Sequence, residues 1–484
     1  MTKSSQNFEH YLEKTGEVGF VEQVFPSLIY ASGLPGVHPS ELVMFESGEI
    51  GQVLSINLKY VEVLVFSPAY MKVGTRIART DDFVSVSAGS GLLGTVVNPF
   101  GVPYGFSKRV LGPVENRYLD LIPSGINDRV NIKDPLETGI SVVDLIVPLG
   151  KGQRELVIGD RKSGKSVFLL QALFNQAVKG EVCIYCLVGK RQSDIMHVNK
   201  YVKEKGVAKQ TIIMASSASD SPGLIFLTPY AAMTIAEYFR DQGKNVVLIL
   251  DDLTTHAAVY REIALLARRF PGRNSYPGDI FYVHSRLLER AGAFKKSTIT
   301  ALIAAETVMG DLSGYIQTNL MAITDGHLFF DIELFNQGIR PAVNPYLSVT
   351  RVGEQAQTPL VRDMGRTISR FLSHYQRLKE LTHFGSEFEQ RVKDELVMGD
   401  KINDFFTQSP DRIVPLPISI FAIGQIWGGV YKRFEAKELS EKIRKYIERY
   451  SSDNAFKGLI DNIISKSQTF EELVKNITND YKEI

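Results

Sequence analysis

The segment Gly159-Asp-Arg-Lys-Ser-Gly-Lys165-Ser166 constrains the fold of this chain more than any other stretch. The apolar run Leu156-Val-Ile158 precedes it and Val167-Phe-Leu-Leu170 follows it, a pattern typical of a strand, a loop and a helix. In that setting the spacing GxxxxGK[ST] predicts a phosphate-binding loop. Its glycines let backbone N–H groups surround phosphates, Lys165 meets the outer phosphates, and the Ser166 hydroxyl binds Mg²⁺.

A helix that starts near Lys165 adds its positive dipole end to this loop. The alternative is a glycine-rich turn with an exposed lysine, and the flanking strand and helix argue against it. The sequence therefore predicts a site for ATP or ADP with Mg²⁺. The residues expected to contact the nucleotide are Arg161, Lys162, Ser163, Gly164, Lys165, Ser166 and Val167.

Length and charge limit the classes of protein to which the chain can belong. Its 484 residues are too many for one core, so about three domains are expected. The 55 basic and 54 acidic side chains nearly cancel, which gives no electrostatic footprint for nucleic acid. No apolar stretch is long enough to span a bilayer, and the segment from Met1 begins no signal peptide. We therefore expect a protein that is cytoplasmic or peripheral to a membrane.

The only cysteines, Cys183 and Cys186, lie within the apolar run 182–188, which has the pattern of a buried strand. Residues three apart on a strand face opposite sides, so neither a disulfide nor a metal pair is natural there. We expect both thiols to pack in the core.

The N-terminal part of the chain changes texture near residue 18. Residues 1–17 form a polar tail in which Phe8, Tyr11 and Leu12 make one short apolar stripe. This stripe is typical of a frayed terminus with a weak helical tendency, and a docking helix is the alternative. Residues 18–87 contain short β-rich runs separated by glycine and proline turns, which predicts a small closed β-barrel.

Residues 88–356 predict an α/β domain with a largely parallel sheet. Its expected strands are residues 155–158, 182–188, 211–215 and 245–250. The last strand ends in Asp251-Asp252, and a carboxylate at the end of an apolar strand downstream of a phosphate-binding loop is where such enzymes hold Mg²⁺. Asp251 is thus the second metal-side candidate, and a strand-end turn aspartate is the alternative.

Residues 357–484 predict a helical bundle, because apolar residues recur there every three or four positions. Pro410, Pro415 and Pro417 interrupt it. The apolar series are Phe384, Phe388, Val392 and Leu396, then Ile443 and Ile447, then Phe470, Leu473, Val474 and Ile477.

With these segments in order, the sequence resembles the α/β nucleotide-binding subunits of F-type rotary ATPases, and more narrowly their alpha, or non-catalytic, type. The resemblance runs from about residue 17 to about residue 430. It is carried by Pro135-Leu-Glu-Thr-Gly-Ile140, Gly152-Gln-Arg-Glu-Leu-Val-Ile-Gly-Asp-Arg161, Ala218-Ser-Asp220, Ser285-Arg-Leu-Leu-Glu-Arg-Ala291 and Gly338-Ile-Arg-Pro-Ala342.

Two positions bear on the type of subunit. Where the beta-type chain carries a glutamate that positions the attacking water, this chain has Gly189-Lys190. A lysine ammonium has donors and no acceptor, so it cannot take the proton of the water. The run from Leu347 to Gly353 resembles the alpha-type segment that lends an arginine, here Arg351, to the neighbouring catalytic site. Without the resemblance, Arg351 would be interpreted as a surface ion-pair residue.

The resemblance further implies an alternating heterohexamer with a beta-type catalytic subunit around a central rotor shaft. It implies that Phe335, Arg340 and Pro341 lie near the base of the nucleotide. The chain departs from the family at Phe25-Pro-Ser-Leu-Ile-Tyr30, where the family has a glycine-rich turn, and in a shorter N-terminal region. Near Phe405 and Thr407 it lacks the pair of glutamines that the family has beside adenine.

Two other functions remain open at this point. One is an alpha-type subunit of a specialised F-type-like ATPase that drives another machine, which only the short N-terminal region favours. The other is a self-sufficient homohexameric ATPase or translocase, which would need its own catalytic glutamate and, for RNA, a basic surface.

Overall fold

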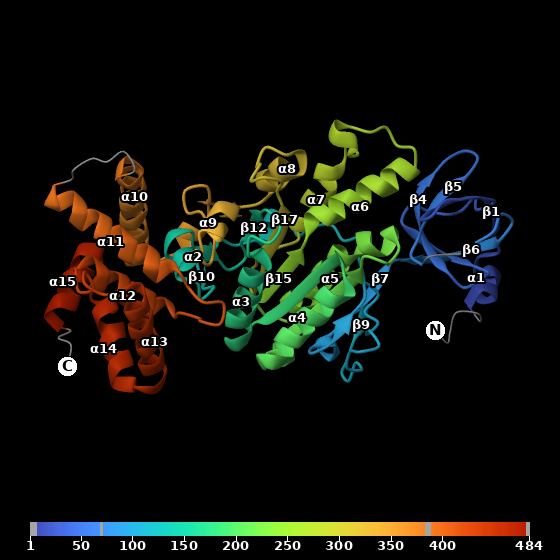
Figure 1. Cartoon of the computed structure of the whole chain (residues 1–484). Coiled ribbons are helices and arrows are strands. Elements are labelled where there is room, and N and C mark those ends of the chain that lie inside the picture. Colours follow the sequence, from blue (N-terminus) through green and yellow to red (C-terminus); the bar gives the residue numbers. More distant parts are fainter. Residues whose placement is uncertain (1–6, 68–70, 383–388, 481–484) are drawn as a thin grey trace. The chain divides into compact units, whose positions relative to one another are not determined.

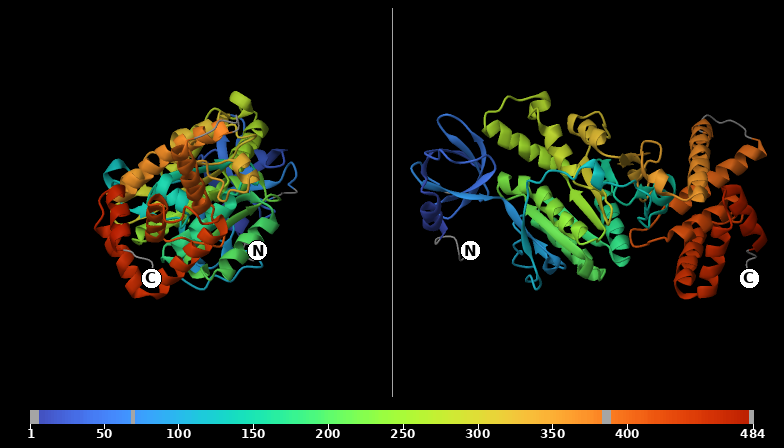
Figure 2. Two further views of the ribbon diagram at one scale, coloured as in Figure 1. Left: turned by 60° about the vertical axis from the view of Figure 1, so that its left-hand side comes forward. Right: turned by 180° about the vertical axis from the view of Figure 1, so that it is seen from behind.

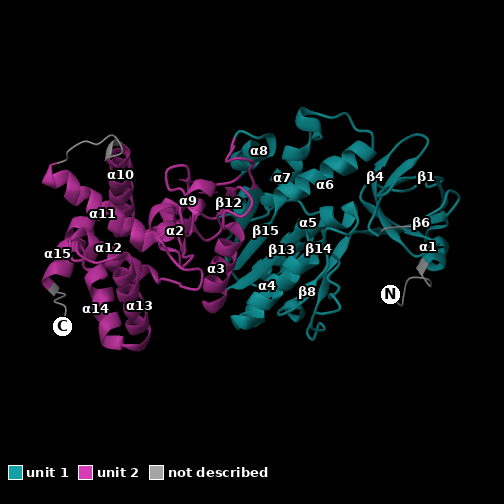
Figure 3. Cartoon of the chain, in the orientation of Figure 1, with its two compact units in different colours: residues 1–129, 180–305, 313–323 teal, residues 130–179, 306–312, 324–484 magenta. Residues whose placement is uncertain are grey.

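A computed structural model describes residues 7–67, 71–382 and 389–480 (Figure 1). The chain forms two compact units, of which unit 1 comprises residues 1–129, 180–305 and 313–323 (Figure 3). Unit 2 comprises residues 130–179, 306–312 and 324–484. The order of barrel, nucleotide-binding domain and helical domain agrees with the sequence, whereas the boundaries expected near residues 17, 87 and 356 stay predictions.

Unit 1 begins with helix α1 (Asn7–Thr15) and a closed six-stranded barrel in the order β1-β2-β5-β4-β3-β6. The strands are β1 (Val18–Val24), β2 (Leu28–Ser32), β3 (Glu41–Phe45), β4 (Ile50–Ile56), β5 (Val61–Val65) and β6 (Arg76–Phe83). All pairs in the barrel are antiparallel, and alternate side chains such as Val43, Val53 and Val63 fill its interior.

The expectation of a frayed N-terminal tail is wrong for residues 7–15. Phe8 is buried against Met44 and Ala78 of the barrel, with Tyr11 and Leu12 packed beside it. The short apolar stripe therefore has a barrel surface to cover, and burial of an aromatic ring stabilises the helix more than its weak propensity does.

The rest of unit 1 is an α/β arrangement around parallel strands. The strands β8 (Val96–Val97), β13 (Val182–Lys190), β14 (Thr211–Ser217), β15 (Val246–Asp251) and β17 (Thr298–Glu306) follow the order β17-β15-β13-β14-β8. Short strands β7 (Ser85–Ala88) and β9 (Glu115–Tyr118) pair separately, and β16 (Gly292–Ala293) pairs with β17. The parallel register Leu187↔Asp251 brings the last residue of β15 opposite β13. Cys183 and Cys186 are buried free thiols in β13, which confirms their packing role.

Among the described residues, unit 1 has five further α-helices. They are α4 (Gln192–Glu204), α5 (Pro222–Asp241), α6 (Leu253–Leu266), α7 (Ile280–Leu288) and α8 (Tyr315–Ile323). Helices α4, α5 and α6 pack on these strands, and α7 packs against α5 and α8. Helix α5 packs against β13, β14 and β15, and it begins where the Ser221 side chain accepts the Leu224 N–H ahead of Pro222. Asp252 caps α6 in the same way through Thr255 N.

Two histidines, His256 of α6 and His284 of α7, are buried where α5, α6 and α7 meet. His256 Nε2 lies 3.1 Å from the Phe226 carbonyl oxygen and donates to it, so His256 Nδ1 accepts from His284 Nε2, also 3.1 Å away. His284 Nδ1 is then a buried acceptor without a partner among the described residues. Burial lowers the pKa of His256 to about 4 and holds the pKa of His284 well below its usual value.

We predict that acid destabilises unit 1 through this pair. Because the folded pKa of His256 lies below the unfolded value of about 6.5, its contribution is complete above about pH 6.5 and is lost as the pH falls towards 4, which amounts to about 3 kcal/mol. The measurement is the denaturant midpoint of the wild-type chain against pH. His256→Gln should flatten the profile, whereas His197→Gln, on the exposed face of α4, should not. A wild-type profile that stays level from pH 7 to 4 would contradict the prediction.

Unit 2 contains the strands β12 (Arg154–Gly159) and β18 (Gly326–Phe330), which pair in parallel, and β19 (Val349–Thr350), which pairs antiparallel with β18. The short strands β10 (Pro135–Leu136) and β11 (Leu149–Gly150) flank α2 (Ser141–Ile146). Helix α3 (Lys165–Val178) follows β12, and α9 (Ile332–Asn336) follows β18. The predicted strand, loop and helix around residues 159–166 are therefore confirmed.

The end of unit 2 is the predicted helical domain. It comprises α10 (Pro359–Thr382), α11 (Gln390–Phe406), α12 (Leu416–Trp427), α13 (Ala436–Ser452), α14 (Asn454–Ser465) and α15 (Phe470–Asp480), and helices α11 to α15 gather beside one another in every view (Figure 1, Figure 2). Ile443, Phe470 and Leu473 are buried, as their spacing predicts. Phe384 and Phe388 lie outside the described residues. No described helix is long and apolar enough to cross a membrane.

Candidate functional site

The phosphate-binding loop connects β12 to α3 within unit 2. Lys162 has φ +64° and Gly164 has φ +101°, so the loop turns through the left-handed region just before the helix. Gly164 is the N-cap of α3 and has no side chain to accept the N–H groups of the first turn. These donors have no partner inside the helix, which is the arrangement that binds phosphate.

Side chains of the loop add charge and hydroxyl groups to this helix end. Lys165 Nζ donates to the carbonyl oxygens of Gly159 (2.6 Å) and Asp160 (2.7 Å) and thereby lies across the loop. The buried Ser163 Oγ has no hydrogen-bond partner among the described residues. Ser166 and Val167 are exposed. An ammonium, an unpaired hydroxyl and the end of a helix together fit a phosphate group.

Two contacts fix the loop from the side of residues 306–310. The carboxylate of Asp160 accepts Thr307 Oγ1 at 2.5 Å and Gly310 N at 3.0 Å. Arg161 Nε donates to Glu306 Oε2 at 2.7 Å, although the Arg161 side chain is 81% exposed. Arg161 is therefore held in an ion pair, which it would have to exchange in order to contact a phosphate.

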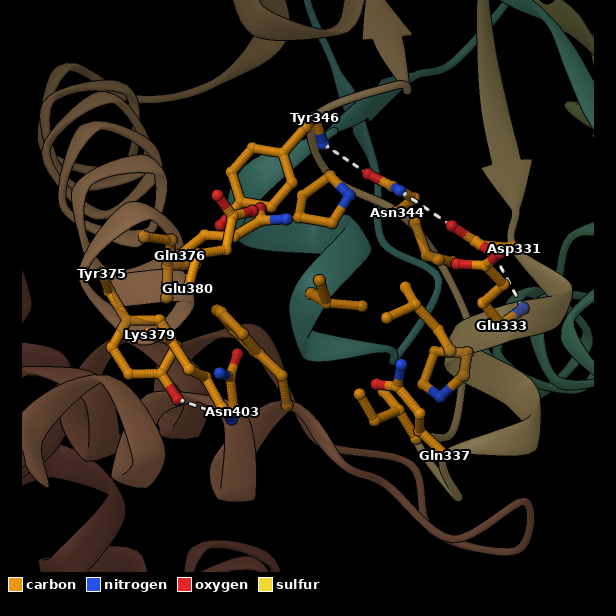
Figure 4. A pocket seen from close by; sticks show the side chains of 18 residues that line it. Asp331, Glu333, Gln337, Asn344, Tyr346, Tyr375, Gln376, Lys379, Glu380 and Asn403 are labelled. Carbon is orange, nitrogen blue, oxygen red and sulfur yellow. Dashed lines mark hydrogen bonds between the residues drawn. The ribbon is translucent and has the colours of Figure 1, made fainter. Parts of the chain in front are cut away.

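Two of the three residues expected beside the base are in contact with each other. Phe335 lies next to the loop, since a Cβ on Gly164 would lie 3.8 Å from its ring, and the Arg340 guanidinium stacks 3.4 Å from the centre of that ring. Pro341 instead lines a cavity of about 370 Å³ beside α9, α10 and α11 (Figure 4). Phe335 and Arg340 are thus brought together, and Pro341, the residue that follows Arg340, lines this cavity.

The sequence analysis did not identify Gln408, which lies next to the expected positions Phe405 and Thr407. Its amide is buried, donates to Gly139 O at 2.7 Å and accepts Ser141 N at 3.2 Å. Gln408 is therefore used to join the helical domain to α2 within unit 2. The only feature of the sequence that could have pointed to Gln408 is its position between Thr407 and Ser409-Pro410, beside the expected site.

Asp251 belongs to unit 1, whereas the phosphate-binding loop belongs to unit 2, so their expected meeting stays a prediction. Within unit 1, Lys190 Nζ lies 2.8 Å from Asp251 Oδ1 and 2.7 Å from Asp252 Oδ2. Burial on its own lowers the pKa of Lys190, but the carboxylates of Asp252 and Asp251 outweigh it, so this pKa is raised above its usual value. Lys190 therefore stays protonated and has no lone pair with which to act as a base.

Arg351 follows β19 in unit 2 and is exposed. Its side chain makes no hydrogen bond or ion pair with the residues that the structure describes. The backbone around it is fixed, because Arg351 N donates to Asp325 O at 3.2 Å and Thr350 Oγ1 donates to Pro148 O at 2.8 Å. Gly353 approaches the Pro148 carbonyl so closely that a Cβ there would clash. The fold thus presents a guanidinium from a rigid backbone and leaves it unpaired within these residues.

Comparison with known proteins agrees with this geometry. Residues 139–350 match the ATP synthase alpha/beta family, nucleotide-binding domain, and residues 357–484 match the ATP synthase alpha/beta chain, C terminal domain. ATP synthase subunit alpha of Sulfurovum sp. (strain NBC37-1) is 40% identical over 418 residues, which cover 85% of this chain and 82% of that protein. ATP synthase subunit alpha of Neorickettsia sennetsu (strain ATCC VR-367 / Miyayama) is 35% identical over 475 residues, which cover 94% and 93% respectively. The chain therefore belongs to the ATP synthase alpha/beta family, as an F-type subunit of the alpha type.

Proposed function

We propose that this chain binds ATP without hydrolysing it and lends Arg351 to the catalytic site of a neighbouring beta-type chain. The observation that carries the proposal is the exposed Arg351 guanidinium, which has no side-chain partner among the described residues and stands on a backbone fixed at Thr350 and Gly353. Burial raises the pKa of the Glu155 carboxyl, and Arg351 is close enough to lower that pKa by a smaller amount, but the two groups form no ion pair or hydrogen bond that would tie the guanidinium down. A fixed guanidinium stays charged and can grip phosphate oxygens with two donors.

The chain's own nucleotide would be held by residues 161–167, with Lys165 and the first turn of α3 on the phosphates. Phe335, Arg340 and Pro341 are proposed beside the base, where the rigid Pro341 would form a wall against the ring. Mg²⁺, when bound, would supply positive charge to the outer phosphates, with the exposed Ser166 hydroxyl as a protein ligand and Asp251 as the second candidate. Ser166 fits this role, whereas both carboxylate oxygens of Asp251 already have partners.

The proposed assembly is an alternating heterohexamer of this chain with a beta-type chain around a central rotor shaft. The chain would be cytoplasmic and would reach a membrane only through that complex. Lys190 supports a non-catalytic role for this chain beside a catalytic beta-type chain, because a protonated lysine paired with two carboxylates cannot activate water.

The purified chain should bind Mg-ATP and hydrolyse it negligibly. Lys165→Ala should weaken ATP binding by about 10- to 100-fold, because a charged hydrogen bond contributes about 1.5–3 kcal/mol. Lys200→Ala, at an exposed ion pair with Glu204, is the matched control and should leave binding unchanged. Calorimetric titration gives the affinities, and a phosphate-release assay gives the turnover.

Turnover by the pure chain at about 1 to 100 per second, as in kinases, would contradict the non-catalytic assignment and favour a self-sufficient homohexameric ATPase. In the assembled complex, Lys165→Ala should reduce nucleotide retained by this chain more than it reduces turnover. Equal losses of both would mean that this site takes part in the chemistry.

A further inference from the structure

Lys190 lies between the two carboxylates that end β15, and together they form a closed polar cluster in unit 1. Its ammonium is 2.8 Å from Asp251 Oδ1 and 2.7 Å from Asp252 Oδ2. The remaining oxygens are also engaged, since Tyr185 OH donates to Asp251 Oδ2 at 2.9 Å and Thr255 N donates to Asp252 Oδ1 at 2.6 Å. Every oxygen of the two carboxylates therefore has a partner within the protein.

The cluster is built into the fold rather than formed at its surface. Asp251 is 6% exposed, Asp252 is 2% exposed and Tyr185 is fully buried. The backbone that carries Lys190 is held where Gly189 N donates to Ser216 Oγ at 3.0 Å and Ala218 N donates to Lys190 O at 2.8 Å. Buried carboxylates are stable only when they are paired, and here the ammonium of Lys190 supplies the pairing charge.

We propose that Lys190 is an internal counter-cation that takes the place of a divalent metal at Asp251, so that this chain binds nucleotide with little dependence on Mg²⁺. Mg²⁺ seeks carboxylate oxygens that still carry negative charge. An ammonium already in contact with Asp251 both neutralises that carboxylate and repels a second cation. The proposal rests on the proposed function in taking this chain to bind nucleotide with Asp251 as the metal-side group.

The first test is the affinity of the full chain for ATP in excess EDTA and in excess Mg²⁺. The wild-type affinities should agree within about threefold, whereas in Lys190→Gln binding in Mg²⁺ should be at least about tenfold tighter than in EDTA. Lys200→Gln, which removes an exposed lysine paired with Glu204, should behave as the wild type. A wild-type chain that requires Mg²⁺ as strongly as Lys190→Gln does would overturn the proposal.

The second test uses Mn²⁺ and no nucleotide, with free Mn²⁺ followed by electron paramagnetic resonance. Lys190→Gln should bind Mn²⁺ at least about tenfold more tightly than the wild type, and Lys190→Arg should not. If Lys190→Gln does not fold, Lys190→Gln with Asp252→Asn removes the excess negative charge and leaves a side-chain oxygen to cap α6 at Thr255. Equal Mn²⁺ binding by the wild type and the variants would refute the role of Lys190. Failure of every variant to bind ATP would count against the proposed nucleotide site, and the Mn²⁺ comparison would still decide this proposal.

Discussion

Replacing Arg351 by alanine should reduce ATP turnover of the assembled complex by about 10³- to 10⁵-fold, or about 4–7 kcal/mol of barrier. Phosphoryl transfer spreads negative charge over the γ-phosphate oxygens, and a guanidinium aimed there stabilises the transition state more than the ground state. Because Arg351 makes no side-chain hydrogen bond or ion pair with the described residues, its removal breaks no such bond within them. Assembly and ATP binding by the beta-type partner should therefore be nearly intact.

Because the backbone around Arg351 is fixed, a lysine at this position tests the shape of the charged group and not its location. Thr350 and Gly353 hold the segment against Pro148, so a lysine at 351 would start from the same place. Arg351→Lys should nevertheless rescue turnover poorly, because an ammonium lacks the planar two-donor fork. Arg444→Ala, an exposed arginine paired with Glu448 on α13, is the control and should keep full turnover.

The measurement is steady-state ATPase activity of reconstituted complexes, with nucleotide occupancy determined in parallel. An Arg351→Ala complex that keeps more than about a tenth of wild-type turnover has lost less than about 1.4 kcal/mol of transition-state stabilisation. Arg351 would then not be the arginine lent to the catalytic site of the beta-type chain. Loss of occupancy together with turnover would point to a structural role instead.

The parts of the fold that could be predicted from the sequence are those indicated by a pattern within one short stretch of residues. The strand, loop and helix around residues 159–166 follow from local apolar periodicity and glycine spacing, and β13, β14 and β15 follow from short apolar runs. The helical domain was predictable because apolar residues recur there every three or four positions, and those that are buried include Ile443, Phe470 and Leu473. The docking of α1 could be stated only as an alternative, because nothing near Phe8 indicates that Met44 and Ala78 form the surface that it covers.

The same limit holds for the candidate site, where short motifs could be located in the sequence and contacts between distant residues could not. Sequence spacing located Lys165 and Asp251, but it did not predict that Lys190 would pair with Asp252, which is 62 residues away. Its grouping of Pro341 with Phe335 and Arg340 beside the base stays a prediction. Side-chain pairing across elements depends on tertiary register, which a single sequence does not record.

A buried ion pair, also missed in the sequence, gives the second large expected effect. Arg290 is 1% exposed and donates from Nε to Glu237 Oε1 at 3.1 Å and from Nη2 to Glu237 Oε2 at 2.5 Å. Its other donors reach Leu119 O at 3.0 Å and Thr234 Oγ1 at 2.7 Å. Glu237→Ala should therefore destabilise unit 1 by about 3–5 kcal/mol, because it leaves a buried guanidinium without a counter-charge.

Hydrogen exchange of the core amides of α5 and β15 measures this loss directly, since the opening of one region stays well defined in a chain of several domains. Exchange in Glu237→Ala should be roughly 10²- to 10⁴-fold faster than in the wild type. Arg290→Met with Glu237→Met should recover most of the loss, because two apolar side chains of similar length leave no charge to desolvate. Lys200→Ala, at an exposed pair, should change exchange by less than about 1 kcal/mol. If Glu237→Ala exchanges like Lys200→Ala, the pair carries no net stability. If the double variant is no better than Glu237→Ala, the loss comes from packing around α5 and not from the stranded charge.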